Sequence, residues 1–292
     1  MKGSKYIFGL LILVLTLIGL SIGNSPDANL HLIACDVGQG DGILATYKNV
    51  QVLIDGGPGD GILECLSRHI PFWDRELELV VLTHPQLDHY GGLIEVFRRY
   101  KVNTFLANGL DSSASSYQAL KNAVGGSGAR VLTPQEGMVL RIGMIYLDIL
   151  SPSQRLLTQE ASNSQTNVLG AFSSKRDPNE FSVVAILRLG EFEALLTGDI
   201  GPSEISEILS SGKVRDVEYI KIPHHGSKNG LTLKLLETSS PEIAVISVGK
   251  NSYGHPSEET LRMLKEAGVR TLRTDEEGDI EVISDGLSFW TN

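Results

Sequence analysis

The sequence predicts an α/β fold in which two β-sheets pack together and helices cover their outer faces. Short apolar runs of strand length alternate with helical patterns along the whole chain. The second half repeats the scheme of the first without an exact internal repeat, and no linker divides the 292 residues. A chain of this length buries roughly 75% of the surface that it exposes when unfolded, so we expect one large domain.

The first 25 residues are set apart from this domain, which we place at residues 26–292. Lys2 and Lys5 precede an almost continuous apolar stretch at residues 6–22. This layout is typical of an export signal that is later removed. An uncleaved membrane anchor is the alternative, because about 17 apolar residues lie at the lower limit for a membrane span. In both cases the positive residues stay inside, so the domain is expected outside the cytoplasm, secreted or membrane-attached.

The first half of the domain begins with three strands joined by turns that contain glycine or asparagine, and helices and strands then alternate. We expect strands at residues 30–36, 43–47, 51–55, 77–83, 103–107, 130–132, 139–142 and 144–150, and helices at residues 61–69, from Asp88 and near 117–124. The last two strands form a hairpin that turns at Gly143. Residues 151–180 are polar and patternless, so we expect a long loop there, which in a compact domain is usually functional or mobile.

The second half contains strands at residues 182–189, 193–197, 217–222 and 242–248, and a final set within residues 270–290. Helices are expected after Pro202, near residues 231–238 and after Ser257. Proline suits the first position of a helix because its missing N–H has no partner there. Serine suits the position before a helix because its hydroxyl accepts a hydrogen bond from a free backbone N–H.

Cys35 and Cys65 are the only cysteines in the sequence. In an exported protein two cysteines can pair as a disulfide. They stand far apart and no disulfide framework pattern is visible. We therefore expect two buried thiols, one on a strand and one on a helix.

The charge of the chain is acidic, with 25 Lys and Arg against 35 Asp and Glu and a formal net charge of −10. Proteins that hold nucleic acid by charge usually have a basic excess. The composition therefore counts against tight non-specific binding to DNA. It does not exclude a local cationic site made by metal ions.

Metal-binding side chains gather where the expected strands end. The segments are LTHPQLDHYGG with His84, Asp88 and His89, LLTGDI with Asp199, IKIPHHGS with His224 and His225, and SYGHPS with His255. Imidazole and carboxylate groups together are what zinc, manganese and iron take from a protein. Five of the seven histidines fall in these segments. The other two, His31 and His69, stand alone and are expected on the surface or in the core.

These segments resemble the metallo-β-lactamase-fold hydrolases, whose signature is H-x-H-x-D-H after a strand, then a later His, an Asp and a final His. The likeness is closer to the hydrolase domain of ComEC-type DNA-uptake (competence) proteins. It covers about residues 30–292 and is carried by CDVGQGDGILATYKNVQVLIDGG, LTHPQLDHYGG, NEFSVVAILRLGEFEALLTGDI, IKIPHHGSKNG and ISVGKNSYGHPS. The resemblance implies a four-layer αββα sandwich. The glycine-rich VGQGDG does not fit the G-x-G-x-x-G pattern of dinucleotide sites, because Ile43 occupies the position of the third glycine.

The resemblance also implies ligands for one or two divalent ions, zinc or manganese. His84 would bind one ion, Asp88 and His89 the other, Asp199 would bridge the two, and His225 or His224 would complete the second site. Asp55 of LIDGG would orient the histidines from behind. A water held by the ions would lose a proton near neutral pH and attack the substrate.

Substrate-binding residues follow from the same resemblance. The substrate's oxygens would be held by Asn179, Ser182, Ser227, Tyr253 and His255. His255 would also protonate the leaving group, so Asp88 and His255 are the residues expected to take part directly in catalysis. For Ser227 and Tyr253, ordinary packing in a turn is the alternative.

Gln86 departs from the pattern, because the broad family has histidine there and ComEC-type sequences often have aspartate. Its neutral amide oxygen is a weaker ligand than either. No histidine lies between His89 and His224, an absence that ComEC-type sequences share. We therefore predict one firmly held ion and one weaker ion. The firm site is Asp88, His89, Asp199 and His225, and the weaker site is His84 and Asp199 with Gln86 and waters.

We expect the chain to be a metal-dependent hydrolase of phosphodiester bonds, with DNA as its substrate. PHHGS and YGHP beside two metal ions suit the clamping of a phosphate. A hydrolase of small esters, lactones or lactams is the first alternative, since one fold can serve several chemistries. A binding protein whose site has decayed at Gln86 is the second.

Overall fold

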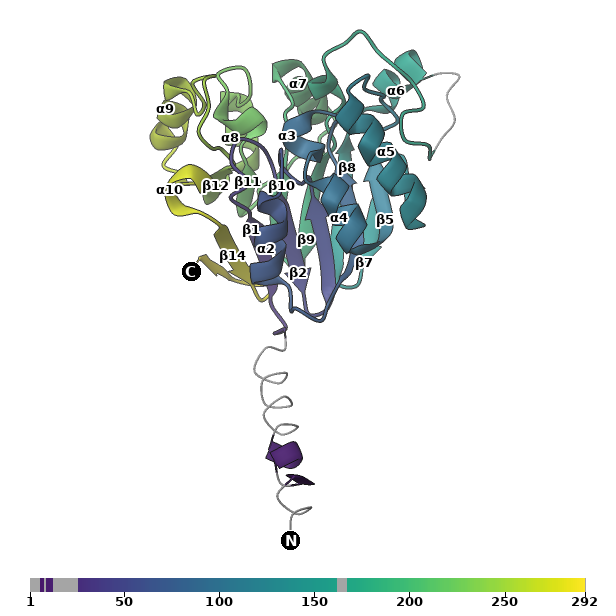
Figure 1. The fold of residues 1–292 in the computed structure, drawn as a ribbon. Helices are drawn as coiled ribbons and strands as arrows, with labels where there is room; N and C mark the ends of the chain where they lie inside the picture. The colour runs from purple at the N-terminus through teal and green to yellow at the C-terminus, as the bar shows by residue number, and fades with distance from the viewer. Residues whose placement is uncertain (1–5, 8, 13–25, 162–166, 292) are drawn as a thin grey trace.

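The computed structural model describes residues 6–7, 9–12, 26–161 and 167–291, and in this part of the chain two β-sheets lie face to face (Figure 1). The first sheet has eight strands among the described residues. In spatial order they are β15 (Phe289–Thr291), β14 (Ile280–Ser284), β1 (Leu30–Ala34), β2 (Ile43–Tyr47), β3 (Val50–Ile54), β4 (Glu76–Leu82), β5 (Lys101–Ala107) and β6 (Arg130–Leu132). β3 to β6 run parallel to one another, and the remaining pairs are antiparallel.

The second sheet has seven strands within the described ranges. Their order is β13 (Arg270–Arg273), β12 (Ile243–Ile246), β11 (Tyr219–Lys221), β10 (Phe192–Leu196), β9 (Val184–Leu189), β8 (Ile145–Ser151) and β7 (Val139–Ile142). β10 to β13 run parallel, which places their carboxyl ends at one edge of the sheet.

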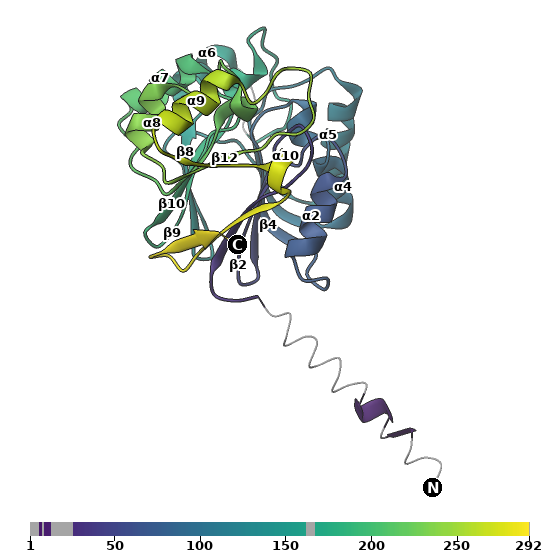
Figure 2. The ribbon, with the colours of Figure 1, turned by 90° about the vertical axis from the view of Figure 1, so that its left-hand side faces the viewer.

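Helices cover both outer faces, as the view in Figure 2 shows. On the first sheet lie α2 (Gly61–His69), α4 (Leu93–Arg99) and α5 (Ser115–Ser127), and on the second α7 (Pro202–Ser210), α8 (Leu233–Ser239) and α9 (Glu258–Glu266). Shorter segments are α3 (Leu87–Tyr90), α6 (Gln154–Ala161), α10 (Thr274–Glu277), and the 3-10 turns η1 (Pro178–Phe181) and η2 (Pro223–Gly226). The four layers confirm the predicted αββα sandwich.

Alternation along the strands builds three apolar layers. In β1, Leu32 points into the core between the sheets, while Ile33 packs beneath the helices of the first face. β4 does the same with Val81 and Val80. Successive side chains of a strand point to opposite faces, and a sheet covered on both sides therefore needs the nearly continuous apolar runs seen in the sequence.

Most predicted elements are confirmed to within a few residues, and α2 has the predicted bounds. Pro202 opens α7, and the Ser257 hydroxyl accepts a hydrogen bond from the Thr260 amide at the start of α9. Gly143 turns the β7–β8 hairpin with a positive φ of 62°. The long loop predicted at residues 151–180 is wrong in part, because it contains α6 and η1. The polar composition of α6 hid its single apolar stripe, of which Leu157 is buried.

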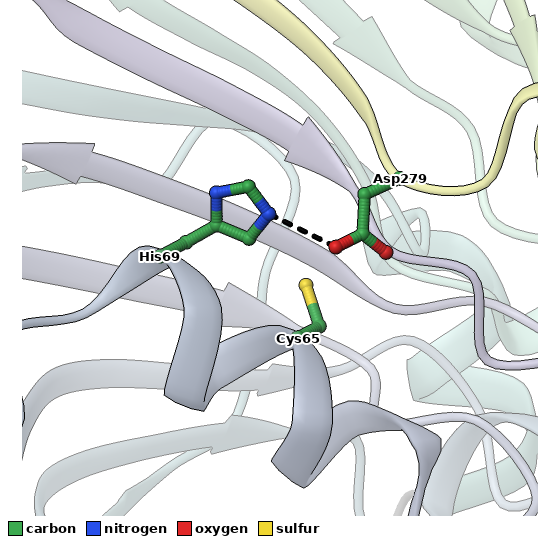
Figure 3. Close-up of side chains that lie close together, drawn as sticks. All are labelled: Cys65, His69 and Asp279. Carbon is green, nitrogen blue, oxygen red and sulfur yellow. Dashed lines mark hydrogen bonds and ion pairs between the residues drawn. The ribbon is translucent and has the colours of Figure 1, made fainter.

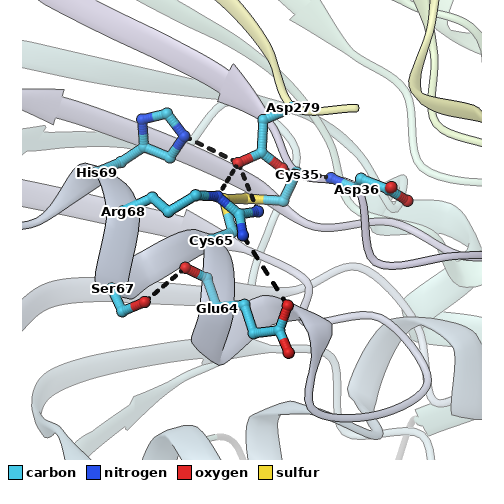
Figure 4. Close-up of a disulfide and its surroundings, with 8 residues drawn as sticks. All are labelled: Cys35, Asp36, Glu64, Cys65, Ser67, Arg68, His69 and Asp279. Carbon is cyan, nitrogen blue, oxygen red and sulfur yellow. Dashed lines mark hydrogen bonds and ion pairs between the residues drawn. A yellow bond between two sulfur atoms is a disulfide. The ribbon is translucent and has the colours of Figure 1, made fainter. Parts of the chain in front are cut away.

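The two buried thiols that we expected are instead a disulfide between Cys35 and Cys65 (Figure 4). Cys35 follows β1, and Cys65 lies on the face of α2 that packs against the first sheet. The two positions are 30 residues apart in sequence, but their Cα atoms are 5.8 Å apart. Sequence spacing does not show this proximity, because it arises only when α2 folds back over β1.

Asp279 adds an ionic contact beside this disulfide. Its carboxylate lies 2.9 Å from Nε2 of His69 and 2.7 Å from a guanidinium nitrogen of Arg68, and it accepts a hydrogen bond from the Asp36 amide (Figures 3 and 4). Cys65 lies close to His69 and Asp279, but its sulfur is bonded to Cys35, so these three residues form no metal site. The contact joins α2 to the segment that leads into β14.

His31 and His69, expected on the surface or in the core, are both half-buried in ion pairs. His31 lies 2.9 Å from Asp27 and 2.8 Å from Glu281, and His69 pairs with Asp279 as above. The predicted N-terminal signal or anchor at residues 1–25 falls mostly outside the described residues. Among the residues described, no helix has both the length and the apolar character needed to cross a membrane.

Candidate metal centre

The polar side chains singled out from the sequence meet at one edge of the sandwich. Asp55 follows β3, His84 follows β4, Asp199 follows β10 and His225 follows β11. The parallel strands of both sheets end at this edge, where open α/β sheets place their sites. α3, which carries Asp88 and His89, lies at the same edge (Figure 1). The fold thus brings together segments that are more than a hundred residues apart.

His89 is oriented by the buried carboxylate of Asp55. Its Nδ1 lies 2.7 Å from Oδ2 of Asp55, whose two oxygens also accept hydrogen bonds from the amide and hydroxyl of Thr83. Because Nδ1–H donates to a carboxylate, Nε2 is the ring nitrogen that a metal ion would bind, with release of any proton that it carries. This atom points at Asp199 and lies 3.3 Å from its Oδ2. Asp55 thus contacts His89, one of the histidines that it was expected to orient, on the side of the ring away from Asp199.

His225 is held in the same manner from the second sheet. Its Nδ1 lies 2.9 Å from the backbone carbonyl of Ser247, and its Nε2 lies 3.3 Å from Asp199 and 3.6 Å from Asp88. His224 and His225 both have positive φ, 51° and 52°. This tight left-handed turn directs His225 inward and leaves His224 half-buried above it. Of the two histidines left open by the sequence, the structure brings His225 to the cluster.

His84 completes the floor of the site. Its Nδ1 lies 3.0 Å from the Thr83 hydroxyl and 3.3 Å from the Ser182 hydroxyl. Its ring centre is 4.1 Å from that of His89. Ligand atoms of His84, His89 and Asp199 all lie within 4.8 Å of one another. Those of Asp88, His89 and His225 do so as well, so His89 belongs to both groups.

The Nε2 atoms of His84, His89 and His225 are all buried without a hydrogen-bond partner in the described structure. Buried polar atoms are nearly always paired, since an unpaired one costs free energy. Three such atoms converging with two carboxylates fit ligands of a divalent ion. The donor set, nitrogen and carboxylate oxygen without a thiolate, suits zinc or manganese.

Two buried groups at this site were missed from the sequence. Lys221 is fully buried, forms an ion pair with Asp41, donates to the Gly198 carbonyl at 3.1 Å and lies 3.5 Å from Asp199. Asp41 also lies 3.2 Å from Nδ1 of His225. The one signal for Lys221 is a lysine between two isoleucines of a buried strand. Asp41 had no signal beyond its place in VGQGDG.

The electrostatics of the cluster favour bound cations. Burial alone would raise the pKa of Asp41, but the charges of Lys221 and His225 hold it at about 2. Burial opposes charge on His89 too, yet Asp199 and Asp55 raise its pKa to about 10. Burial, with His89 beside it, lowers the pKa of His84 to about 3. Burial opposes charge on His225 as well, but Asp199 and Asp41 raise its pKa. The carboxylates of Asp41 and Asp199 thus stay ionised, and the imidazoles of His89 and His225 hold positive charge that a metal ion would replace by releasing protons.

An open cavity of about 650 Å³ lies over the cluster. Predicted site residues in its lining are Gln86, Asp88, Asn179, His224, His225, Tyr253 and His255, joined by Gln39, Pro58, Leu87, Lys250, Asn251 and Ser252. The His255 ring lies 5.7 Å from that of His224 and is stacked on Tyr253 at 5.8 Å. Burial, with His224 and His225 nearby, lowers the pKa of His255.

Ser182 and Ser227, which were expected to bind substrate, do not line this cavity. The Ser182 hydroxyl is buried and accepts a hydrogen bond from the Asp199 amide at 3.2 Å while it contacts His84. The Ser227 hydroxyl accepts from the amide of Asn229 at 3.2 Å, within the turn that follows η2. The Ser182 hydroxyl therefore contacts two candidate ligands, and the Ser227 hydroxyl makes a hydrogen bond within its own turn.

Curated relatives match the chain with low identity over most of its length. The chain is 28% identical over 269 residues to ComE operon protein 3 of Bacillus subtilis, covering 84% of this chain and 32% of that protein. It is 23% identical to Recombination protein 2 of Haemophilus influenzae, and 27% identical to Competence protein ComA of Neisseria gonorrhoeae, covering 94% and 88% of this chain. It thus spans about a third of the length of the curated relatives that it matches.

Solved structures share the fold. The metallo-beta-lactamase fold protein YhfI of Bacillus subtilis superposes with a TM-score of 0.51 at 12% identity, over 83% of this chain and 95% of that one. Tm1679, a metal-dependent hydrolase of the beta-lactamase superfamily, has a TM-score of 0.50 at 14% identity, over 86% and 98%. The family model described as the metallo-beta-lactamase superfamily matches residues 35–250. The chain therefore belongs to the metallo-beta-lactamase superfamily of hydrolases.

Proposed function

We propose that the chain hydrolyses phosphodiester bonds of DNA with the help of divalent metal ions, outside the cytoplasm. One observation carries the proposal. Three buried imidazole nitrogens without hydrogen-bond partners meet two carboxylates, and two of these groups, Asp88 and His225, line an open cavity. Lys250, His224 and His255 lie in the lining of that cavity, so an anionic substrate finds positive or hydrogen-donating groups there.

Asp88, His89, Asp199 and His225 would hold the firmer ion, and His84 with Asp199 the weaker one. A divalent ion at this position supplies Lewis-acid charge to a phosphoryl oxygen and lowers the pKa of coordinated water. The chain's contribution is to fix the ligands. Asp55 and the Ser247 carbonyl hold the two imidazoles by Nδ1, so that Nε2 faces the centre.

The lining residues would position the phosphate and manage the proton of the leaving group. Asn179, Lys250 and Tyr253 offer hydrogen-bond donors to phosphate oxygens. The lowered pKa of His255 keeps its ring mostly neutral at pH 7. A phosphate anion beside it would favour the protonated form. That imidazolium would then give its proton to the leaving oxygen.

DNA is favoured as the substrate by the relatives named as competence and recombination proteins. The acidic net charge of this chain means that DNA would be held mainly at the cavity and less by long-range attraction. The Cys35–Cys65 disulfide supports a location outside the cytoplasm, because disulfides persist in oxidising compartments. We assign the N-terminal apolar stretch to export or membrane attachment.

The test is cleavage of labelled single- and double-stranded DNA by the full chain, first stripped of metal and then supplied with manganese or zinc. We expect cleavage only with metal, and at least a hundredfold loss in the Asp199→Ala variant, because both ion sites lose a ligand. Hydrolysis of a chromogenic lactam or lactone without DNA cleavage would overturn the substrate assignment. Bound metal without turnover of any of these substrates would indicate a decayed site.

A further inference from the structure

Two large aromatic side chains stand exposed at the end of the sandwich opposite the candidate metal centre. Phe72 is 74% exposed and Trp73 45% exposed, and their rings meet edge to face at 5.2 Å. They lie between α2 and β4, so they precede the strand whose other end leads to His84. Contiguous apolar groups exposed on a soluble protein often mark a surface that binds a partner or a membrane.

The chain enters the domain at this same place. Pro26 and Asp27 line a hollow of about 530 Å³ together with Phe72 and Trp73. The apolar stretch of the sequence ends at Ile22. Four residues reach at most about 14 Å, even when fully extended. Wherever the apolar stretch resides, the aromatic pair therefore lies close to the point at which that stretch ends.

The cations of the hollow are offset by carboxylates. His31 lies between Asp27 and Glu281, and the Arg68 guanidinium is bound by Asp279. Lys48 lies over the ring of Tyr47. Such a surface has no excess of cations with which to select an anionic ligand. Aromatic side chains beside ion-paired polar groups are instead suited to the interface between water and lipid. There the rings enter the lipid and the polar groups stay in water.

We propose that this end of the domain rests on the headgroup layer of a phospholipid bilayer, with Phe72 and Trp73 inserted into it. The inference rests on the membrane-attached form of the proposed function, in which residues 6–22 enter the same bilayer. It adds the orientation of the domain relative to that bilayer. α3, which carries Asp88 and His89, lies at the end of the sandwich far from the start of β1 (Figure 1). The candidate metal centre would therefore face away from the lipid, where a long polymer can reach it.

The experiment measures whether lipid touches Trp73. The sequence has two tryptophans, so the Trp290→Phe variant of the full chain leaves Trp73 as the sole reporter. The chain is added to phosphatidylcholine vesicles with or without bromine on the acyl chains. We expect at least a twofold lower emission in the brominated vesicles. Adding anionic lipid should change this little, because the carboxylates of the hollow offset its cations.

A matched control places the reporter at the other end of the molecule. Leu233 is 55% exposed at the start of α8, so a chain with Trp73→Phe, Trp290→Phe and Leu233→Trp reports on the edge that holds the metal centre. Its emission should not differ between the two kinds of vesicle.

Two results would overturn the proposal. One is equal Trp73 emission in both kinds of vesicle, whether or not the chain sediments with them. The other is shielding of Trp73 that grows with protein concentration in the absence of lipid, which would assign the surface to a second copy. The Phe72→Ser/Trp73→Ser variant separates this inference from the proposed function. We expect it to cleave DNA in solution as the parent chain does.

Discussion

Lys221 is a fully buried ammonium in the wall of the candidate metal centre. It pairs with Asp41 and reaches one oxygen of Asp199, while the other oxygen of Asp199 faces His89 and His225. The fixed charge thus keeps both carboxylates ionised and divides the two oxygens of Asp199 between the protein and the imidazoles. Metal ligation alone would not explain why a lysine occupies a buried strand, because its ammonium group cannot bind a metal ion.

Replacing Lys221 should show how much its ammonium group contributes to the free energy of unfolding. In Lys221→Met, Asp41 remains buried without its main cation, which should cost about 3 kcal/mol of the free energy of unfolding. Urea denaturation in the absence of metal measures this cost. Lys213→Met is the matched control, because Lys213 is exposed, its partner Glu136 is only half-buried, and the pair should contribute less than about 1 kcal/mol. Equal losses in the two variants would show that Lys221 has no special role.

At this scale, the candidate ligands were predictable and their supports were not. His84, Asp88, His89 and Asp199 follow strand ends in a recognisable order, so local sequence was enough to find them. The choice of His225 over His224 depends on two left-handed residues, which no side-chain pattern reveals. The roles of Asp41, Lys221 and Ser182 arise from contacts between the two sheets, and such contacts exist only in the folded chain.

At the scale of elements, periodicity located the strands well because both sheets are covered on both faces. It failed where an element is short or polar. α6 has too few apolar residues to stand out within residues 151–180. α2 was predicted with its correct bounds, but its position over the end of β1 was not. That position brings Cys65 of α2 next to Cys35 at the end of β1, so that the two can form the disulfide.

The disulfide should stabilise the domain by constraining the unfolded chain. For a loop of this length the loss on removal is about 3.6 kcal/mol, which thermal unfolding of a Cys35→Ser/Cys65→Ser variant would measure as a lower melting temperature. A thiol reductant should lower the melting temperature of the parent chain and leave that of the variant unchanged. A parent chain that is indifferent to reduction under unfolding conditions would contradict this.

At the scale of the whole molecule, residues from both ends of the domain are bound to each other. Asp279 binds Arg68 and His69 of α2, and β14 pairs with β1. Burial alone would raise the pKa of Asp279, but hydrogen bonds from His69, the Asp36 amide and Arg68 lower it to about 2. The overall layering was predictable from the alternation of elements. This closure was not, because it joins residues about two hundred positions apart.

The lowered pKa of Asp279 predicts how stability changes with acid. Because the folded-state pKa lies below the ordinary value of 3.8, the stabilisation is complete above about pH 4 and is lost as the pH falls towards 2. Asp279→Asn should therefore cost about 1 kcal/mol at pH 7, after allowance for solvent screening of this partly exposed group. Urea unfolding of both chains at several pH values measures the difference, which should shrink below pH 4. A difference that stays constant with pH would refute the ionic origin.

The pairing of β1 with β14 also bears on how the chain acquires its fold. His31 and Glu281, whose side chains are in contact across these strands, are 250 positions apart. Contacts of such separation form slowly, because a long loop must close first. A polypeptide delivered with its N-terminus first would keep one edge of β1 open until nearly the whole domain had followed. An open edge is a template for strand addition, so this interval is when the chain is most exposed to aggregation and has most need of a chaperone.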